Sequence, residues 1–293
     1  MELKEKLVSS FIAFENQISL DNTFVHDMRT EAIKRFESEG FPAKKDEAWK
    51  YTSLKKVLKQ DFSVFAKKEF AVEYKDVQPY FIHDIDSYKI VFVDGKYASH
   101  LSETTHEGID ICLMSAALSQ PKYRLVIENY FNKTAEKNSL TSLNTAFTNE
   151  GAYIHITKNK LVEKPIQIIH FSTGSEAALL LQPRNLIVVD ENAHVQIIER
   201  HQSLTDNPTL TNCVTEIFAD KRAIVDYYKV QNDKENASLV DSTFIDQKRE
   251  SHVSVHTFSF GGKLTRNNLN FYQNGEYIDS TLNGVTIIGN KQH

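Results

Sequence analysis

The fold class of this chain is decided by one stretch, Leu186-Ile187-Val188-Val189-Asp190-Glu191-Asn192-Ala193-His194-Val195-Gln196-Ile197-Ile198. Two short runs rich in valine and isoleucine lie on either side of a polar corner, and the corner ends in a small residue. Short runs of this composition, bounded by polar turn-forming residues, are typical of β-strands. The stretch therefore predicts a strand, a corner and a second strand.

The same pattern of corner, small residue and alternating strand recurs along the second half of the chain. It begins near Ala193, Ala223, His252 and Tyr277, at separations of 30, 29 and 25 residues. A repeat of about 20–50 residues indicates a solenoid or a propeller, and the WD and kelch motifs of propellers are missing. Periodicity alone leaves both a β-helix and a stacked β-sandwich open. We favour the β-helix because the segments are short, the corners are polar and hairpin turns are scarce.

Helical periodicity stops at Gly151, and β-rich segments continue from there to residue 293. Besides the opening stretch, they cover 153–156, 166–169, 179–181, 214–218, 224–228 and 253–255. We therefore expect a mainly β protein in two parts. Residues 1–150 should form an N-terminal helical and small α/β region, and residues 151–293 a β-helix core.

The first part shows helical periodicity up to about residue 60. Apolar side chains recur there at three- and four-residue spacing, at Phe24, Met28, Ala32, Ile33 and Phe36. Further on, Asp94-Gly95 between 88–93 and 96–98 predicts a hairpin, because Asp-Gly accepts the positive φ of a tight turn. A short strand is expected at 109–113, and helices are expected around 123–131 and 139–147.

The only tryptophan lies in the motif Gly40-Phe41-Pro42-Ala43-Lys44-Lys45-Asp46-Glu47-Ala48-Trp49-Lys50-Tyr51-Thr52. Gly40 and Pro42 should end the preceding helix, since glycine favours the left-handed cap and proline cannot continue the hydrogen-bond ladder. The acidic pair that follows suits the first turn of another helix. We expect Trp49, Tyr51 and Leu54 to pack this second helix against the first.

Composition excludes several classes of protein. The net charge of −5 provides no basic surface, so nucleic acid is not an expected partner. No apolar run approaches the roughly 18–20 residues needed to span a bilayer, so no membrane association is expected. The N-terminal segment is charged and lacks the apolar core of a signal peptide, which predicts a cytoplasmic location.

Two motifs that could carry chemistry are incomplete. Cys112 and Cys213 lie 101 positions apart, a pattern of neither a disulfide framework nor a closed cysteine metal site, and each is expected to be a small core residue. The run Gly261-Gly262-Lys263-Leu264-Thr265 resembles a phosphate-binding loop. Leu264 occupies the hydroxyl position and Thr257 replaces the first glycine, so ATP binding is not expected.

A carbohydrate-active β-helix enzyme is the alternative function. Its candidate carboxylates are Asp190 and Glu191 at a corner and Glu199, Glu216 and Asp226 on predicted strands. None of them belongs to a repeating Asp-x-Asp arrangement that would build a calcium site or an acid/base pair. We therefore assign no catalytic residue.

The eleven histidines suggest metal sites, but none is convincing in the sequence. His252 and His256 share a predicted strand face at a separation of about 13 Å, too far for one ion. His155 with His170, and His194 with Asp220, could stack on adjacent segments, although solvated strand residues are the simpler interpretation. We assign no metal or cofactor ligand. If the chain nevertheless held a cluster, the first candidates would be His155, His170, His194 and Cys213.

An ordered series of residues resembles the SufD family, the scaffold subunits of the SUF iron–sulfur cluster assembly system. The series begins with the tryptophan motif. It continues through Phe92-Val93-Asp94-Gly95, Leu143-Asn144-Thr145-Ala146-Phe147, Arg184, Glu199, Glu216, Gly261-Gly262, Arg266-Asn267 and Gly284. The related SufB family fits less well, because it would lack the Trp-Lys-Tyr-Thr motif and would carry more cysteines in its β-helix.

The resemblance implies an N-terminal helical region, a central right-handed parallel β-helix and a C-terminal helical region. It also implies a non-enzymatic scaffold that pairs with a SufB-like paralogue through the β-helix and with a SufC-like ATPase through the C-terminal region. This chain ends at His293, where the family continues, so we expect the C-terminal helices to be missing from it. The complex would then handle the cluster transiently, this chain would bind none stably, and its open β end could form a homodimer.

Overall fold

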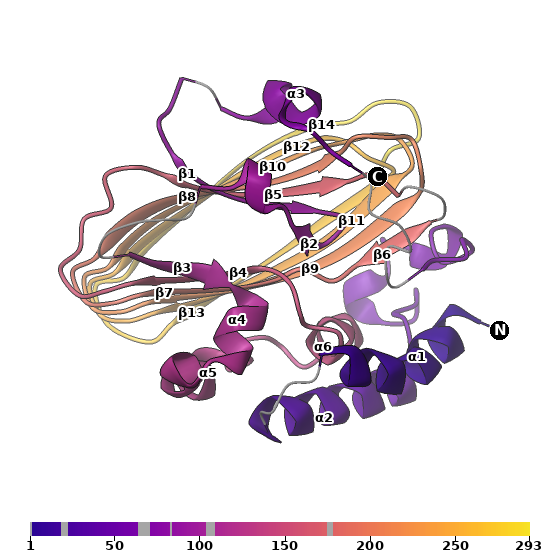
Figure 1. The fold of residues 1–293 in the computed structure, drawn as a ribbon, viewed down its shortest axis with the longest axis horizontal. Coiled ribbons are helices and arrows are strands. Elements are labelled where there is room, and N and C mark those ends of the chain that lie inside the picture. The colour runs from indigo at the N-terminus through magenta and orange to yellow at the C-terminus, as the bar shows by residue number, and fades with distance from the viewer. Residues whose placement is uncertain (1, 19–22, 64–70, 83, 104–108, 175–177) are drawn as a thin grey trace.

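The computed structural model describes residues 2–18, 23–63, 71–82, 84–103, 109–174 and 178–293, and they form a flattened β-solenoid of about four turns with helices packed against it (Figure 1). The helices are α1 (Leu3–Ile18), α2 (Thr23–Glu39), α3 (Tyr74–Val77), α4 (Met114–Ser119), α5 (Arg124–Tyr130) and α6 (Ser139–Ala146). The first seven strands in chain order are β1 (Tyr88–Val93), β2 (Lys96–Tyr97), β3 (Ile109–Leu113), β4 (Ala152–Ile156), β5 (Ile166–Ser172), β6 (Leu179–Leu181) and β7 (Arg184–Val189). The next seven are β8 (His194–Ser203), β9 (Thr209–Ala219), β10 (Ile224–Asp233), β11 (Ala237–Gln247), β12 (His252–Gly261), β13 (Leu264–Gln273) and β14 (Asp279–Ile287).

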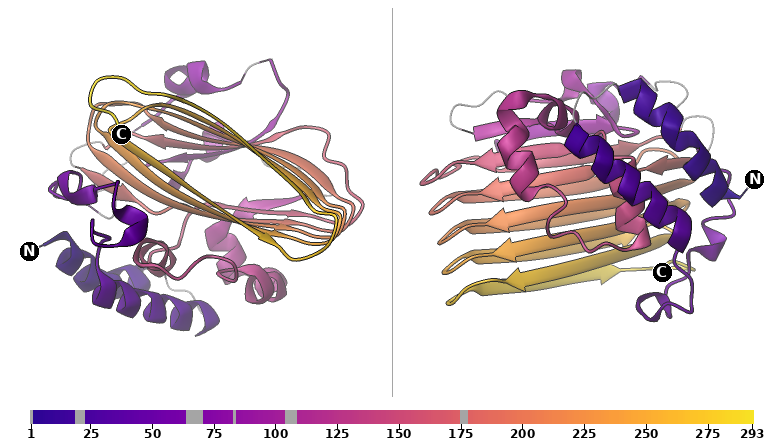
Figure 2. Two further views of the ribbon diagram at one scale, coloured as in Figure 1. Left: turned by 180° about the vertical axis from the view of Figure 1, so that it is seen from behind. Right: turned by 90° about the horizontal axis from the view of Figure 1, so that it is seen from below.

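From β8 onward the chain alternates between two sheets. The first sheet has the order β14-β12-β10-β8-β5-β1-β2, and the second has the order β13-β11-β9-β7-β4-β3, with β6 beside β9. Neighbouring strands from successive coils are parallel, as in the pairs β8–β10 and β9–β11. Figure 2 shows the coils stacked on one another in chain order. The predicted β-helix is therefore confirmed, because a sandwich of hairpins would pair consecutive strands antiparallel.

One left-handed residue marks the corner of each coil. Its φ is positive at Asn159, Asn192, Arg222, Glu250 and Tyr277. The amide of each of the first four donates to a carbonyl in the corner of the next coil, at 2.9–3.1 Å. The small residues that follow three of these corners are fully buried: Ala193, Ala223 and Ser251. The polar corner and the small residue that define the sequence repeat thus form the stacked edge of the solenoid.

The space between the two sheets is filled by side chains from alternate strand positions, because successive residues of a strand point to opposite faces. One half of this interior is apolar. It is built from Ile166, Ile168, Ile187, Val195, Ile197, Ile217, Val225, Ile245 and Val253, all buried. Valine and isoleucine suit such a position, since branched side chains pack well on a pleated surface. The other half is polar and contains the candidate site.

The N-terminal region packs against the outer face of the second sheet and against the β1–β5 end of the first. Helices α1, α2 and α6 share one apolar cluster, while α4 and α5 pack through Met114, Leu118 and Ile127 onto Tyr153 and Leu186 of the second sheet. The turn around α3 packs instead on the first sheet, at its β1–β5 end. Five helices lie together on one side of the solenoid, namely α1, α2, α4, α5 and α6, and α3 lies on the other side (Figure 1).

Local predictions for the N-terminal region are largely confirmed. Asp94 and Gly95 both have positive φ in the β1–β2 hairpin, where Phe92 pairs with Tyr97. Gly40 is left-handed, and its amide donates to the carbonyl of Phe36 at the end of α2. The strand expected at 109–113 is β3, and the two later helices are α5 and α6. The described part of residues 151–293 contains no helix.

The expected role of Trp49 is wrong. Residues 47–49 form a single 3-10 turn rather than a helix, and Tyr51 is 80% exposed. The half-buried Trp49 packs against a cluster that includes Val240 and Leu264 of the second sheet. Its ring also lies under the Arg266 guanidinium, 4.2 Å from ring centroid to carbon. The tryptophan therefore fastens the N-terminal region to the solenoid and does not join two helices.

Candidate functional site

The polar half of the solenoid interior begins where the inward-facing side chains of β8 change from apolar to polar. Val195 and Ile197 point inward with the apolar half, and the next two inward positions carry Glu199 and His201. Both of these polar side chains are at least nine-tenths buried. A buried charged group is costly unless it is paired, so the surroundings of Glu199 define the site.

Coil stacking places a second histidine directly beside His201. In the register of the first sheet, Phe92 of β1 pairs with His170 of β5, His170 with His201 of β8, and His201 with Gln231 of β10. The two imidazoles are stacked, with ring centroids 4.7 Å apart, and the Phe92 ring lies 5.2 Å from His170 on the other side. This ladder holds both imidazoles in fixed orientations on adjacent coils.

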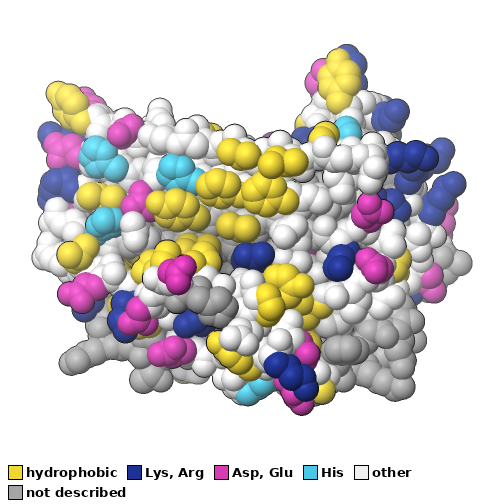
Figure 3. All heavy atoms as spheres, turned by 90° about the horizontal axis from the view of Figure 1, so that it is seen from above, with side chains coloured by type: hydrophobic (Ala, Val, Ile, Leu, Met, Phe, Trp, Pro, Cys, Tyr) yellow, Lys and Arg dark blue, Asp and Glu magenta, His cyan; other side chains and the backbone are white. Residues whose placement is uncertain are grey.

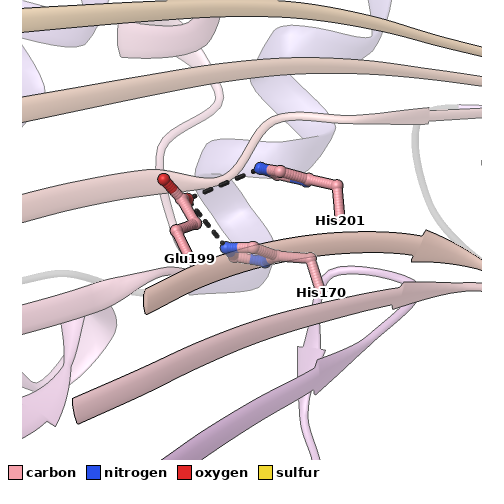
Figure 4. Close-up of side chains that lie close together, drawn as sticks. All are labelled: His170, Glu199 and His201. Atoms are coloured by element: carbon pink, nitrogen blue, oxygen red, sulfur yellow. Dashed lines mark ion pairs between the residues drawn. The ribbon is translucent and has the colours of Figure 1, made fainter. Parts of the chain in front are cut away.

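The two histidines converge on the Glu199 carboxylate. The distance from Oε1 of Glu199 is 3.2 Å to Nε2 of His170 and 3.5 Å to Nε2 of His201 (Figure 4). One ligand atom from each of the three residues lies within 4.8 Å of the others. Imidazole nitrogen and carboxylate oxygen are both common ligands of zinc and iron, so this set is a candidate for holding a metal ion.

Three further groups surround the same carboxylate. The Asn185 amide donates to Oε1 of Glu199 at 2.7 Å, and the Cys213 thiol lies 3.5 Å from that oxygen. The Tyr227 hydroxyl donates to Oε2. Asn185 and Cys213 come from the second sheet, so the site is closed by both sheets.

The contacts between the histidines and Glu199 do not have hydrogen-bond geometry. Nε2 of His170 and Nε2 of His201 are both buried, and neither has a hydrogen-bond partner, although both lie within ion-pair distance of the carboxylate. Buried polar atoms in folded proteins are almost always satisfied. Two unsatisfied nitrogens aimed at one oxygen therefore need an explanation.

Burial and the attraction between opposite charges shift the pKa values of His170, His201 and Glu199 in opposite directions. Burial lowers the pKa of His170, and contact with Glu199 offsets this only in part. Burial also lowers the pKa of His201, but there the carboxylate prevails and raises that pKa above its ordinary value. For Glu199, burial raises the pKa, but the two histidines outweigh burial and hold the pKa well below its usual range. The carboxylate is thus ionised.

A second buried ion pair lies in the same interior. Nζ of Lys229 is 2.5 Å from the Asp241 carboxylate and donates to the Thr243 hydroxyl at 2.7 Å. These opposite charges compensate each other. Among the described residues, the ion-pair contacts of the Glu199 carboxylate are with His170 and His201.

The pairs of residues that the sequence analysis considered do not form. His155 and His170 lie in different sheets, and Nε2 of His155 contacts the Asp190 carboxylate at 3.0 Å. His194 contacts Asp226 at 3.4 Å rather than Asp220. His252 and His256 have separate neighbours, Asp279 and Tyr228. Of the four candidates for a cluster, His170 and Cys213 each lie near the Glu199 carboxylate without forming a ligand group with each other, and His155 and His194 lie elsewhere.

The carboxylates considered for carbohydrate chemistry do not converge either. Glu199 faces the solenoid interior, whereas the buried Glu216 pairs with Arg184 at 2.5 Å. Glu216 also accepts hydrogen bonds from the amides of Asn132, Thr134 and Ala135. It therefore fastens the segment after α5 to β9, which is a structural role. Asp190, Glu191 and Asp226 each contact different basic groups.

The sequence contains a signal for the pairing of His170 with His201, which the sequence pattern alone did not reveal. His170 and His201 are separated by 31 positions, close to the 30-residue step from Ala193 to Ala223. Extending the repeat backwards by one coil would have placed the two histidines at equivalent positions. The sequence repeat begins near Ala193 and therefore does not include His170.

Comparison with known proteins gives matches along most of the chain. A model described as the SufBD protein N-terminal region matches residues 1–168. A second, described as the SUF system FeS cluster assembly SufBD core domain, matches residues 170–293. Among the described residues, none of the helices combines the length and apolarity needed to cross a membrane.

Three curated proteins illustrate the similarity. An iron–sulfur cluster assembly SufBD family protein of Synechocystis is 26% identical over 86% of this chain and 57% of its own length. SufD of Bacillus subtilis is 28% identical over 53% of this chain and 37% of its own length. SufD of Escherichia coli is 22% identical over 85% of this chain and 56% of its own length. The chain thus spans about half the length of the curated relatives that it matches, and these matches confirm the resemblance to SufD.

Proposed function

Because the chain belongs to the SufBD family of SUF-system proteins, we propose that it is a non-enzymatic scaffold subunit in iron–sulfur cluster assembly. The observation that carries this proposal is the match of two family models, in order, to residues 1–168 and 170–293. The β-solenoid supports it, since a rigid stack of coils offers long surfaces and strand edges for partners. The cytoplasmic location stays a prediction.

We propose that a SufB-like paralogue pairs with this chain through the solenoid. The outer face of the first sheet carries a stripe of partly exposed apolar side chains, which we call the apolar stripe: Tyr228, Val230, Phe258 and Phe260. Hydrophobic side chains gather in a row across this face, which is open to solvent (Figure 3). Exposed apolar patches of this kind commonly mark protein interfaces.

Co-expression with a SufB-like paralogue and a SufC-like ATPase tests the scaffold proposal. We expect the chain and the SufB-like protein to elute together from a size-exclusion column. Phe258→Glu should weaken this complex at least tenfold, because it places a charge in the apolar stripe. Leu125→Glu is the matched control, since Leu125 is 69% exposed on α5, away from the stripe. Separate elution of the unmodified proteins would contradict the proposal.

For the SufC-like ATPase we propose docking through a region C-terminal to residue 293. The 293-residue chain by itself should then fail to retain the ATPase on a column. Retention of the ATPase by this chain alone would show that the docking surface lies within the solenoid or the N-terminal region.

We further propose that this chain holds no iron–sulfur cluster stably and that the assembled complex handles the cluster transiently. Cluster sites normally need several thiolates close together. Cys213 faces the solenoid interior, whereas Cys112 packs with α4 and α5 outside it. Anaerobic reconstitution with iron and sulfide should leave no chromophore on the protein after gel filtration, and a stoichiometric chromophore would contradict this.

A further inference from the structure

We propose that His170, Glu199 and His201 bind one divalent first-row transition-metal ion, Zn²⁺ or Fe²⁺. The proposal goes beyond the scaffold function and does not depend on it. It concerns a single ion enclosed in the solenoid, which is distinct from an iron–sulfur cluster.

The distances around Glu199 suit metal coordination. With metal–nitrogen and metal–oxygen bonds of about 2.0–2.1 Å, neighbouring ligand atoms of a tetrahedral ion lie about 3.3–3.4 Å apart. The observed separations from Oε1 of Glu199 are 3.2 Å to His170 and 3.5 Å to His201, and one ligand atom from each of the three residues lies within 4.8 Å of the others. The three residues can therefore share one ion after small movements of their side chains.

The unsatisfied nitrogens point to the same conclusion. Nε2 of His170 and Nε2 of His201 lack hydrogen-bond partners although they are buried and directed at the carboxylate (Figure 4). An ion placed between them and Oε1 would accept a lone pair from each ring and remove both unsatisfied atoms. The donor set of two imidazoles and one carboxylate favours Zn²⁺ or Fe²⁺ over Mg²⁺ or Ca²⁺, which prefer oxygen ligands.

Charge balance in the interior also favours a divalent ion. Asp241 is paired with Lys229 at 2.5 Å, whereas the ion-pair contacts of Glu199 among the described residues are with the two imidazoles. One divalent ion held by neutral imidazoles would supply the counter-charge of this carboxylate. Since the site is closed by both sheets, the ion is expected to enter as the chain folds.

Refolding in the presence of a chosen metal tests the site. The 293-residue chain is unfolded in denaturant and refolded with Zn²⁺, anaerobically with Fe²⁺, with Mg²⁺, or with a chelator alone. After desalting, the metal content is measured. We expect one Zn²⁺ or Fe²⁺ per chain, no Mg²⁺, and a higher melting temperature for the metal-loaded samples. A parent protein that retains neither Zn²⁺ nor Fe²⁺ would overturn the proposal.

His201→Gln is the decisive variant. The next coil carries Gln231 at the equivalent position, so the ladder accommodates a glutamine. We expect His201→Gln to reduce retained metal at least tenfold while the circular dichroism spectrum stays unchanged. His155→Gln is the matched control and should keep the metal, because His155 contacts Asp190 outside the site. If His201→Gln and the parent retained equal amounts of metal per chain, the metal would be bound by other residues and the proposal would be overturned.

Discussion

Glu150 lies at the entrance to the solenoid, where the chain passes from α6 to β4. Its Oε2 atom is buried and has no hydrogen-bond partner. Burial raises the pKa of this carboxyl to about 7, and the nearby Lys96 ammonium opposes the rise only in part. The folded chain therefore binds a proton here that the unfolded chain releases near pH 4.5.

This shift predicts a specific pH dependence. Between about pH 4.5 and 7 the folded state binds more protons at Glu150 than the unfolded state, so its contribution to stability falls as the pH rises. Glu150→Gln removes the ionisation. At pH 8 the variant should be more stable than the parent by up to about 3 kcal/mol, and near pH 4.5 the difference should be small. Urea unfolding at both pH values checks this, and a difference independent of pH would contradict it.

Trp49 and Tyr51 are neighbouring aromatic residues with different surroundings. Trp49 is half-buried and contacts Arg266, whereas Tyr51 is 80% exposed. We expect Trp49→Ala to cost about 2 kcal/mol, less than for a fully buried ring, because apolar contact and the cation–π contact are both lost. Tyr51→Ala should stay within about 0.5 kcal/mol of the parent. Denaturant unfolding compares them, and equal losses would contradict a docking role for Trp49.

At the scale of the elements, the solenoid depends on close backbone approach where a strand enters it. Gly151, just before β4, has a φ of 144°, and a Cβ added there would lie 1.9 Å from the carbonyl oxygen of Arg184. A glycine is required at this point because the backbone of Arg184, the first residue of β7, passes directly over it. Gly284, inside β14, has no such neighbour, since the nearest heavy atom to an added Cβ is 3.9 Å away.

The two glycines form a matched pair for substitution. Gly151→Ala should destabilise the protein by about 3 kcal/mol or more, because the backbone of β4 or β7 must move. Gly284→Ala should change the stability by less than about 1 kcal/mol, since the added methyl group has room. Thermal unfolding of both variants measures the contrast. A small loss for Gly151→Ala would show that β4 and β7 can separate at low cost.

At the scale of the whole molecule, β13 and β14 are the last strands that the described residues add to the two sheets. Within the described residues, β14 is hydrogen-bonded to β12, and β13 to β11. Large apolar side chains are exposed in and just after β14: Leu282, Val285, Ile287 and Ile288. Strand edges with exposed apolar side chains favour pairing with another chain.

The 293-residue polypeptide should therefore self-associate through these edges. We expect sedimentation analysis to show a concentration-dependent equilibrium between monomer and dimer. Ile287→Lys should shift it towards the monomer, because a charge would enter the paired edge. Ile12→Lys is the control, since Ile12 is 70% exposed on α1 in the N-terminal region. A monomer at all concentrations would contradict this prediction.

The sequence alone determined the features that depend on short-range patterns. The short β-rich segments, the polar corners between them, the Asp94-Gly95 hairpin and the end of α2 at Gly40 all follow from residues within a few positions of one another. Each is set by backbone preferences and by the alternation of side chains along a strand, which hold in any context. The resemblance to SufD added the family, but it assigned no residue of this chain to a site.

The tertiary structure decided which distant residues meet. Arg266 and Thr52 are 214 positions apart in the chain but are hydrogen-bonded, and Trp49 packs there against a cluster that includes Val240 and Leu264 of the solenoid. Glu199 meets His170 and His201 because the register between coils places equivalent positions side by side. A shift of one residue would turn each of these side chains to the opposite face of its sheet. The sequence shows the repeat, but only the folded chain shows which of its positions face the same interior.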